Sequence, residues 1–544
     1  MKNLHLFILL ALTIIVSCNK KEQQEKPKLV VGIVIDQMRY DYLTRFADRY
    51  GEDGFKRILK GGFSLENAHY NYIPTYTAVG HTSIYTGTTP TNHGIIGNYW
   101  YDKYLKKDIY CVDDANYNTV GAESGGKKSP YRMQTTTLTD QLRLAQNMQG
   151  KTISIAIKDR SAVLPGGHTA NSAYWFQGKK DGKWITSTFY MNSLPKWVTD
   201  FNASGKVEEY VSKPWNTLYD IATYTKSIDD DNNFEVLFKG ETKPVFPHDI
   251  PNLRAKNGNY DIIKAIPAGN SITTDFAKAA IEGENLGKSD HTDFLAISYS
   301  STDYVGHQFG VASKEIEDTY LRLDKDLAEL FSYLDTKVGK GNYTLFLTAD
   351  HAAVDVPSYL QSLKIPAHYV SSRKFKAFVN NFTLKEFKSA DLVENISNFQ
   401  IFLDKEKITS LKLDVDVVTQ KIAEEVIHFE NIYKVVTAKT LQTTTFTDGI
   451  LQNLQQGYNQ KFSGDILLIP YPATISSTSR KGTTHGSGYS YDTHIPIIFY
   501  GNGIKQGNSK KAYTITDIAP TVANLLQIEF PNGTTGKIVD EVLK

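Results

Sequence analysis

The stretch KLVVGIVIDQ, residues 28–37, is an apolar run that stops abruptly at an acidic residue, Asp36. Residues 29–35 carry no charge, and all of them except Gly32 are Leu, Val or Ile. Such a run predicts a short strand that is buried on both faces, as in a parallel sheet. The same pattern returns in DFLAISYSSTDYVGH (293–307), NYTLFLTADH (342–351) and HIPIIFYGNG (494–503).

Helical patterns lie between these predicted strands. Over 313–334, apolar residues recur every three or four positions, which predicts an amphipathic helix. They are Ile316, Tyr320, Leu323, Leu327, Leu330 and Leu334. The alternation of strands and helices predicts an α/β fold with a doubly wound, mostly parallel sheet and helices on both of its faces. In folds of this kind, ligands bind beyond the carboxyl ends of the strands.

Size and composition fit one large domain over 28–544 with two insertions. The chain has 544 residues, of which 41% are hydrophobic and 22% are charged, as in globular proteins. A net charge of +1 gives no charge-based case for a nucleic-acid partner. Residues 161 to about 270 are rich in aromatic residues and turns, and residues 364 to about 460 carry short β-like and helical pieces. We predict that both insertions wall or cap a site; the alternative is decoration far from the chemistry.

The N-terminus resembles an export signal. An apolar run over 4–16 is too short to span a bilayer and has the length of a signal peptide. It ends in Ile-Val-Ser-Cys, similar to the lipobox of bacterial lipoproteins. We therefore predict a signal peptide over 1–17, lipidation of Cys18 and a polar tether over 18–27; the alternative is a plain cleaved signal. Lipidation leaves Cys111 as the only free thiol, without an intramolecular disulfide.

This signal predicts an exported protein, a periplasmic or cell-envelope lipoprotein of a Gram-negative bacterium. Contact with the membrane is expected only through the lipid anchor at Cys18, because no segment after residue 28 is long and apolar enough to cross a bilayer. The sequence does not indicate an oligomeric state.

Acidic and imidazole side chains follow the predicted strands where each strand ends. Three carboxylates brought together would repel one another unless a cation lies among them. Histidine and carboxylate donors without thiolates suit zinc or manganese. The sequence therefore predicts a divalent metal centre at this edge of the sheet. Its candidate ligands are Asp36, Asp303, His307, Asp350 and His351, with His485 in the glycine-rich GTTHGSG (482–488).

The remaining histidines are expected to be structural hydrogen-bonding groups. Those that could be mistaken for ligands are His81, His93, His168, His368 and His494.

A second feature is the hydroxyl-rich stretch NYIPTYTAVGHTSIYTG, residues 71–87, which contains four threonines and one serine and no acidic residue. One of these hydroxyls is a candidate nucleophile. A threonine hydroxyl is a weak nucleophile at neutral pH, so a base or a metal ion must activate it.

Eight motifs together resemble the alkaline phosphatase superfamily, and within it the PafA-type, zinc-dependent alkaline phosphatases of flavobacteria. The resemblance runs from about residue 28 to the C-terminus, insertions included. The motifs are DQMRYDYL (36–43), PTYTAVGHTSIYTG (74–87), HGIIGN (93–98), IAIKDR (155–160), STDYVGH (301–307), TADH (348–351), GTTHGSGYSYDTHIPIIFYG (482–501) and DIAPTVANLL (517–526).

The resemblance implies a role for each matching position. Thr77 is implied as the nucleophile, with Thr75 as the fallback. Asn98 is implied to donate a hydrogen bond to a phosphoryl oxygen, and Lys158 and Arg160 to contact the other phosphate oxygens. Two zinc ions are implied, one bound beside Thr77 by Asp36, Asp350 and His351, and the other bound by Asp303, His307 and His485.

The expected function is therefore hydrolysis of small-molecule phosphate monoesters through a covalent phosphothreonine. Two cations and an amide favour the dianion of a monoester over a singly charged diester. Two alternatives stay open: a nucleotide pyrophosphatase or phosphodiesterase on the same scaffold, and a non-catalytic surface lipoprotein that binds phosphorylated ligands. A sulfatase is disfavoured because the Cys/Ser-x-Pro-x-Arg sequence is absent around Thr77. A manganese-dependent mutase is disfavoured by the export signal.

Overall fold

The structure is a computed structural model that describes residues 25–544. The predicted signal peptide over 1–17, the lipidation site at Cys18 and most of the predicted tether lie outside the described residues. None of the helices in 25–544 combines the length and the hydropathy that a bilayer-spanning segment needs.

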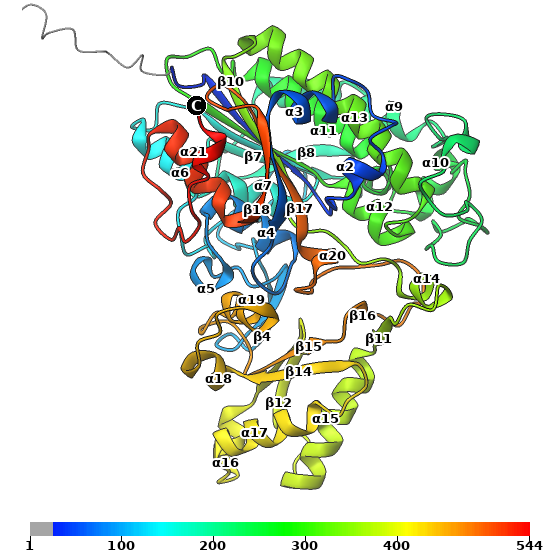
Figure 1. The fold of residues 1–544 in the computed structure, drawn as a ribbon, viewed down its shortest axis with the longest axis vertical. Helices are drawn as coiled ribbons and strands as arrows, with labels where there is room; N and C mark the ends of the chain where they lie inside the picture. Colours follow the sequence, from blue (N-terminus) through cyan, green and yellow to red (C-terminus); the bar gives the residue numbers. More distant parts are fainter. Residues whose placement is uncertain (1–24) are drawn as a thin grey trace, which may run out of the picture.

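A ten-stranded sheet forms the centre of the molecule (Figure 1). Strand β1 lies between β9 and β10 and is parallel to both, and β6 and β7 continue the parallel part. The predicted mostly parallel α/β sheet is confirmed. In spatial order the strands are β18 (Gly507–Thr514), β2 (Phe63–His69), β17 (His494–Gly501), β10 (Tyr343–Thr348), β1 (Leu29–Ile35), β9 (Asp293–Tyr299), β6 (Thr152–Ala156), β7 (Ser172–Gln177), β8 (Lys183–Ser187) and β5 (Thr119–Val120).

One of the four strands first recognised from the sequence differs in direction. β17 pairs with β10 and with β2 in the antiparallel sense, whereas β1, β9 and β10 are parallel. Most of β17 is buried, as in its parallel neighbours. An apolar run indicates that a strand is buried on both faces. It does not indicate the direction of the strand, because burial does not depend on direction.

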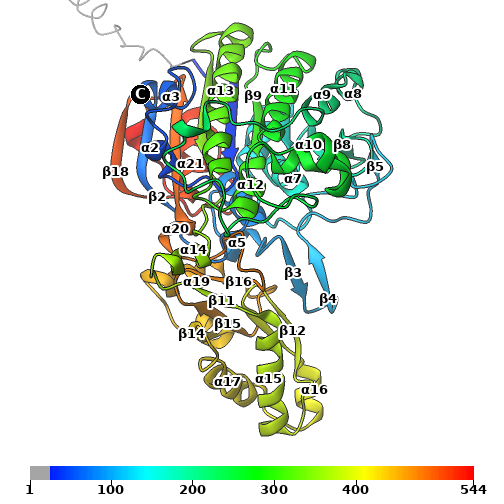
Figure 2. The same cartoon turned by 90° about the vertical axis from the view of Figure 1, so that its right-hand side faces the viewer.

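Helices cover both faces of the sheet, as predicted (Figures 1 and 2). The amphipathic pattern over 313–334 is the helix α13 (Lys314–Leu334), capped by the Ser313 side chain. It packs with α11 (Ala268–Gly283), α12 (Ser301–Phe309) and α3 (Phe55–Gly61) on one face. The opposite face carries α4 (Thr77–Thr86), α6 (Leu138–Ala145), α7 (Asp159–Gly166) and α21 (Ile518–Leu526).

The range 161–270 contributes to the sheet as well as to its surroundings. Its first part includes β7 and β8, which are strands of the central sheet. The part that lies outside the sheet begins after Ser187 and packs around α11 and α12. It contains α8 (Lys196–Ala203), α9 (Lys206–Val211), α10 (Ile250–Leu253) and the 3₁₀ turns Ile221–Thr223, Arg254–Lys256 and Asn259–Ala265.

The second range forms a separate layer, which we call the cap (residues 364–476; Figures 1 and 2). It has its own apolar core, with Val379, Ile401 and Ile422 fully buried. Its four-stranded antiparallel sheet has the order β12 (Val393–Ser397), β13 (Gln400–Leu403), β15 (Ile466–Pro470) and β14 (Ile432–Thr437). The other elements are β11 (His368–Val370), α15 (Ser372–Phe387), α16 (Lys405–Ser410), α17 (Val415–Val426), α18 (Ala438–Thr443), α19 (Gly449–Gly457) and β16 (Thr474–Ser476).

Short elements complete the fold. The hairpin of β3 (Tyr99–Asp102) and β4 (Lys107–Tyr110) lies beside β12 of the cap (Figure 2). The others are α2 (Tyr42–Arg45), α5 (Pro90–His93), α14 (Pro357–Ser362), α20 (Ser490–Thr493), the π-helical turn Asp335–Gly339 and the 3₁₀ turns Ile515–Asp517 and Asp540–Val542.

Candidate metal centre

Three adjacent parallel strands bring three carboxylates together. Asp36 directly follows β1, Asp350 lies two residues beyond the end of β10, and Asp303 lies in the first turn of α12, just after β9. Because β1 is parallel to β9 and β10, the carboxyl ends of all three strands meet at one edge of the sheet. Asp36 and Asp350 are fully buried, and Asp303 is 3% exposed. The sequence-based expectation that these groups converge is met by the geometry.

The three candidate histidines share one hydrogen-bonding arrangement. His351, His307 and His485 each use Nδ1 on a backbone carbonyl, that of Ala352 at 3.1 Å, Thr483 at 2.8 Å and Thr75 at 2.6 Å, respectively. A proton fixed on Nδ1 leaves the Nε2 lone pair available, as in metal-binding histidines. The donor set therefore fits divalent metal ligands.

The Nε2 atoms of these histidines lie near the carboxylates. His351 Nε2 is 3.5 Å from an oxygen of Asp36 and 3.5 Å from one of Asp350. His307 Nε2 is 3.1 Å and His485 Nε2 is 3.6 Å from Asp303 Oδ1.

Within the described residues, two groups have ligand atoms that all lie within 4.8 Å of one another. The first is Asp36, Asp350 and His351, the set implied for one zinc ion. The second is Asp303, His351 and His485, so His351 stands where His307 is implied. The two groups share His351, which makes them neighbours.

The buried carboxylates are poorly compensated by protein groups alone. Asp36 Oδ1 and Asp350 Oδ2 are buried and have no hydrogen-bond partner in the part of the chain that the structure describes. Burial, together with the Asp350 carboxylate, raises the pKa of Asp36 well above its ordinary value. Burial raises the pKa of Asp350 to about 7. Carboxylates in this state are stabilised by nearby positive charge, which a divalent ion supplies.

Thr77 lies beside this centre at the start of a helix. It is the first residue of α4 and is 1% exposed. Its Oγ1 is 3.4 Å from His351 Nε2 and 3.5 Å from Arg160 Nη2. The Thr75 hydroxyl, in contrast, donates to the carbonyl of Ser487 at 2.9 Å. The geometry therefore favours Thr77 over Thr75 as the reacting hydroxyl.

Lys158 has a different set of contacts from the one implied by the resemblance. Its Nζ donates to Asp36 Oδ2 at 2.7 Å and to Asp303 Oδ2 at 2.5 Å, and the residue is 4% exposed. Burial opposes its charge, but the two aspartates raise its pKa above the ordinary value. In this structure Lys158 therefore joins the two carboxylate groups, and its contact with phosphate stays a prediction.

Asn98 lies where the first turn of α4 begins. Its Oδ1 accepts a hydrogen bond from the amide of Ala78 at 2.9 Å. Within residues 25–544 its Nδ2 donates to no protein atom, so this amide is available to a ligand. The same contact fixes Asn98 relative to Thr77, which precedes Ala78 in the chain.

Two positioning groups were missed by the sequence reasoning. Gln37 donates from its backbone amide to Asp350 Oδ1 at 3.1 Å and from Nε2 to Asp303 Oδ1 at 2.8 Å, which connects the two carboxylates. Its φ of 65° is unusual for a residue other than glycine. The only sequence signal is its place directly after Asp36.

The second missed group is Tyr110, whose hydroxyl accepts from Arg160 Nη1 at 3.1 Å and donates to Asp159. Lys128 pairs with Asp159 at 3.2 Å and lies over the Tyr110 ring. These contacts hold the guanidinium in place. Tyr110 lies far from Arg160 in the sequence and has no motif around it, so no pattern could have identified it.

Four of the five histidines expected to be structural, all except His368, have side-chain hydrogen-bond partners among the described residues. His81 Nδ1 lies 3.3 Å from Asp350 Oδ2, but it also contacts the Thr77 carbonyl at 2.9 Å, and its Nε2 contacts Ser298 Oγ at 2.9 Å. Its two nitrogens are therefore engaged. Protein atoms also contact the ring nitrogens of His93, His168 and His494.

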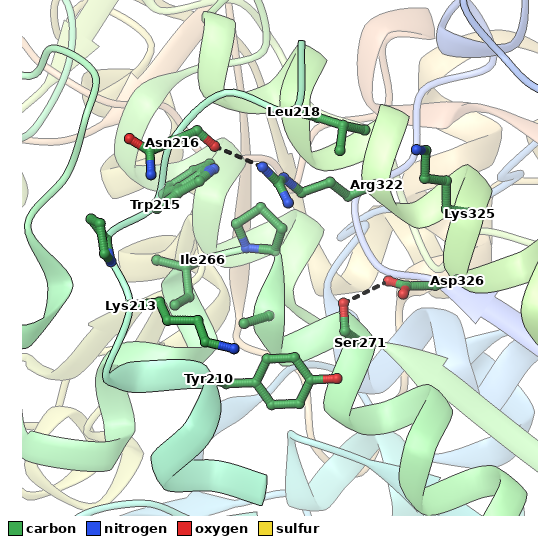
Figure 3. A pocket seen from close by; sticks show the side chains of 13 residues that line it. Tyr210, Lys213, Trp215, Asn216, Leu218, Ile266, Ser271, Arg322, Lys325 and Asp326 are labelled. Carbon is green, nitrogen blue, oxygen red and sulfur yellow. Dashed lines mark hydrogen bonds between the residues drawn. The ribbon is translucent and has the colours of Figure 1, made fainter.

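A large cavity lies away from the candidate metal ligands. It has a volume of about 590 Å³ and lies between α11, α13 and the segment around Trp215 (Figure 3). Ser271 donates to Asp326 there, and Arg322 donates to the carbonyl of Asn216. None of the candidate ligands lines it. Cavity volume alone would therefore select a region that contains none of the candidate ligands.

Fold and site together define a class: a doubly wound α/β hydrolase with a carboxylate–histidine centre beside a hydroxyl at a helix N-terminus. The chain matches the family described as Type I phosphodiesterase / nucleotide pyrophosphatase over residues 30–492. It therefore belongs to that family, and it is a hydrolase of the alkaline phosphatase superfamily.

Three relatives extend over nearly the whole chain. A protein of Myroides odoratus named calcium-transporting ATPase is 48% identical and covers 96% of both chains. Alkaline phosphatase PhoV of Synechococcus elongatus is 47% identical over 95% of this chain and 93% of its own. Alkaline phosphatase PafA of Elizabethkingia meningoseptica is 44% identical over 95% of each chain. The resemblance to PafA-type alkaline phosphatases is confirmed.

Solved structures agree with the sequence relatives. The crystal structure of wild-type PafA matches with a TM-score of 0.92 and 44% identity, over 96% of this chain and 99% of that chain. Murine ectonucleotide pyrophosphatase / phosphodiesterase 5 matches with a TM-score of 0.52 and 14% identity, over 96% of this chain and 100% of that chain, and supports the fold alone.

Proposed function

We propose that this chain is an exported alkaline phosphatase that hydrolyses phosphate monoesters, with Thr77 as the nucleophile and two zinc ions as cofactors. The observation that carries the proposal is the position of Thr77 Oγ1, 3.4 Å from His351 Nε2 and 3.5 Å from Arg160 Nη2. The hydroxyl has a candidate metal ligand on one side and, on the other, a cation suited to phosphate.

The metal ligands proposed here are the two sets implied by the resemblance. Buried carboxylate oxygens without partners and three histidines with Nδ1 fixed support them. When bound, two divalent ions supply positive charge that lowers the pKa of a nearby hydroxyl and stabilises a leaving oxygen. The sets are Asp36, Asp350 and His351 for one ion, and Asp303, His307 and His485 for the other.

The side chain of Thr77 forms the covalent intermediate. Its Oγ1 makes a bond to phosphorus while the ester P–O bond breaks, and the electron pair leaves with the alcohol oxygen, which takes a proton. Water then attacks the phosphothreonine, the bond from Oγ1 to phosphorus breaks, and inorganic phosphate is released. The N-terminus of α4 favours the negative charge of both the alkoxide and the phosphate.

Arg160, Lys158 and Asn98 are proposed to set the substrate class, because together they offer two cations and an amide to phosphate oxygens. A solved structure of a PafA variant carries substitutions at one threonine, one asparagine, one lysine and one arginine. Thr77, Asn98, Lys158 and Arg160 have the same order in this chain, and the threonine–asparagine and lysine–arginine spacings are the same. This agreement supports a shared phosphate site.

A second candidate function is hydrolysis of phosphodiesters, which the description of the matching family favours. The test compares phenyl phosphate with its methyl diester, with ATP added to the panel because the Myroides odoratus relative is named an ATPase. We expect kcat/KM to be higher for phenyl phosphate than for the diester. A clear preference for the diester would overturn the monoesterase proposal.

A catalytically silent binding protein is the remaining alternative. Metal analysis and turnover on the same sample distinguish it from an enzyme. We expect about two zinc ions per chain, loss of turnover on removal of the metal with a chelator, and recovery when zinc is added back. Bound metal without hydrolysis of any phosphoester would identify a binder instead.

Export and anchoring rest on the N-terminal sequence. We propose cleavage before Cys18 and lipidation of its sulfur, which would place the enzyme in the cell envelope. In cells, the full-length protein should fractionate with membranes, and Cys18→Ala should release it into the soluble fraction. Soluble wild-type protein would reject the anchor without affecting the proposed chemistry.

A further inference from the structure

A cavity extends from the metal centre into the contact between the central domain and the cap. It has a volume of about 150 Å³ and is lined by Tyr76, Val354 and His485 from the central domain and by Phe399 and Leu468 from the cap. A second cavity of about 160 Å³ shares Tyr76, Phe399 and Leu468 with it. The two cavities are therefore neighbours, and we call them together the interdomain cavity.

The tip of the β12–β13 hairpin forms one wall of the interdomain cavity. Ser397 pairs with Gln400, so Asn398 and Phe399 form a two-residue turn. Their φ angles of 51° and 56° are those of a hairpin turn that normally takes Asn or Gly. A phenylalanine in this conformation is an outlier. Phe399 is one of the residues that line the cavity.

Two hydrogen bonds hold the hairpin tip in place. Asn398 Nδ2 donates to the carbonyl of Tyr99 at 2.7 Å, and Tyr99 directly follows Asn98 in the chain. The carbonyl of Phe399 accepts from the amide of Leu468 at 2.9 Å. The cap is therefore tied to the phosphate side of the site at the same point at which it contributes an aromatic ring to the cavity.

The cavity reaches the metal centre at His485, which is one of its lining residues. In an in-line displacement the leaving oxygen is opposite the attacking oxygen. In the ligand sets proposed above, Thr77 lies 3.4 Å from His351 of the first set, whereas the cavity is lined by His485 of the second set. An ester whose phosphate contacts Thr77 would therefore direct its alcohol portion toward Tyr76, His485 and the cap.

We propose that the interdomain cavity is a leaving-group pocket that selects phosphate monoesters of apolar, ring-bearing alcohols. This inference rests on the proposed phosphatase function and names its substrate class. A cavity of similar volume, lined by apolar side chains alone, accommodates a benzene ring in another protein. The interdomain cavity has polar lining residues as well, among them Gln400, Ser487 and Asp492. The cap adds further aliphatic side chains to the lining, among them Leu454, Leu467 and Ile469.

The test compares two esters that differ only in the ring, ethyl phosphate and 2-phenylethyl phosphate, so that the reactivity of the leaving alkoxide is nearly matched. We expect kcat/KM of the wild-type enzyme to be about tenfold higher for the ester with the ring, because its apolar area is buried. Phe399→Ala should bring this ratio to within about twofold of unity while the value for ethyl phosphate stays nearly unchanged.

Two further variants make the result specific. Phe387→Ala removes a partly buried ring from the same cap that does not line the cavity, and it should leave the ratio unchanged. Ser476→Phe places a ring on a residue that lines both cavities and should lower the ratio by filling the space. Ser476 is exposed, so this variant keeps the test decisive if Phe399→Ala fails to fold.

The outcomes separate this inference from the proposed function. If the wild-type enzyme hydrolyses both esters with equal kcat/KM, or if Phe399→Ala lowers both values equally, the leaving-group pocket is rejected and the phosphatase stands. If the wild-type enzyme hydrolyses neither ester nor phenyl phosphate, the proposed function itself is rejected.

Discussion

The metal centre and the cap are built in opposite ways. The centre takes its carboxylates from the ends of three parallel strands that also form the core of the central domain. The cap is an antiparallel sheet with an apolar core of its own, and it reaches the site through a hairpin tip and the wall of a cavity. The difference teaches that the candidate ligands depend on the sheet, whereas the proposed choice of leaving group depends on an added layer.

The largest effect is expected from a substitution in the central domain. Thr77→Ala should lower kcat for every ester by about 10³-fold or more, because the covalent route is lost. Circular dichroism and zinc content should match the wild-type protein, since Thr77 contributes little to either. Thr75→Ala is the matched control and should retain most activity. Full activity of Thr77→Ala would reject this residue as the nucleophile.

A smaller effect is expected from Arg160 and Lys158, the two cations proposed to contact phosphate. Arg160→Ala and Lys158→Ala should each lower kcat/KM for phenyl phosphate by about 10²-fold, and by less for its methyl diester, because the diester carries one negative charge fewer. Steady-state kinetics on both substrates measure the ratio. Equal losses on the two substrates would mean that these residues do not set the substrate class.

The Lys158 variant also carries information on the metal sites. Its Nζ contacts Asp36 and Asp303 in this structure, so its removal leaves both carboxylates with less positive charge nearby. Zinc content therefore has to be measured together with the kinetics. Arg160→Ala is the matched control, because Arg160 donates to neither carboxylate among the described residues.

A weaker effect is expected from Tyr110, whose hydroxyl contacts Arg160. Tyr110→Phe removes the hydroxyl that accepts from Arg160 and donates to Asp159, but it keeps the ring. We expect a loss of about three- to tenfold in kcat/KM for phenyl phosphate, because the guanidinium is less well oriented. The same change made on the Arg160→Ala background should have almost no further effect. Additive losses in the double variant would show that Tyr110 acts by another route.

The smallest effect is expected on stability, and it involves a residue of the range 161–270 and not of the cap. His248 lies outside the cap, in the range 161–270, and its nitrogens contact Glu241 at 2.7 Å and Glu315 of α13 at 3.3 Å. Burial opposes its charge, but these hydrogen bonds overcome it and raise the pKa of His248 to about 9. Because the pKa of His248 is higher in the folded protein, its charge stabilises the fold fully at pH values below the ordinary pKa near 6.5. This stabilisation is lost as the pH rises through 9.

His248→Gln should therefore reduce the free energy of unfolding at pH 6 by at most about 3 kcal/mol and lower Tm accordingly. At pH 10 the substitution should have little effect on either quantity. Thermal unfolding of the two proteins at both pH values measures the difference. Asp230 and Glu235 lie near Glu315 and are present in both proteins. Burial raises the pKa of Asp230 and the charge of His248 lowers it, so the change in Asp230 is part of the measured difference. A Tm difference that is the same at both pH values would exclude a charged His248.

The sequence predicted the central domain better than the cap for a physical reason. Asp36, Asp303 and Asp350 follow apolar runs, and the ends of parallel strands meet at one edge, so a local pattern implies proximity. The same pattern did not reveal that β17 is antiparallel, because burial is independent of direction. It also did not reveal that β7 and β8 belong to the sheet, because aromatic residues and turns obscure them.

Groups that act through tertiary contacts had no comparable signal. Gln37 touches the candidate ligands, and Tyr110 touches Arg160, only because the fold brings them there. Phe399 lines the interdomain cavity because a turn in a distant insertion reaches the central domain. The contacts of Lys158 with two carboxylates likewise depend on packing and could not be read from its motif.

The central claim is that six side chains bind two divalent ions beside Thr77. Crystals of the purified zinc-loaded enzyme, measured above and below the zinc absorption edge, test it directly. We predict two anomalous peaks per chain, one among Asp36, Asp350 and His351 and one among Asp303, His307 and His485, with Thr77 adjacent to the first. A single peak, or peaks located elsewhere in the chain, would contradict it.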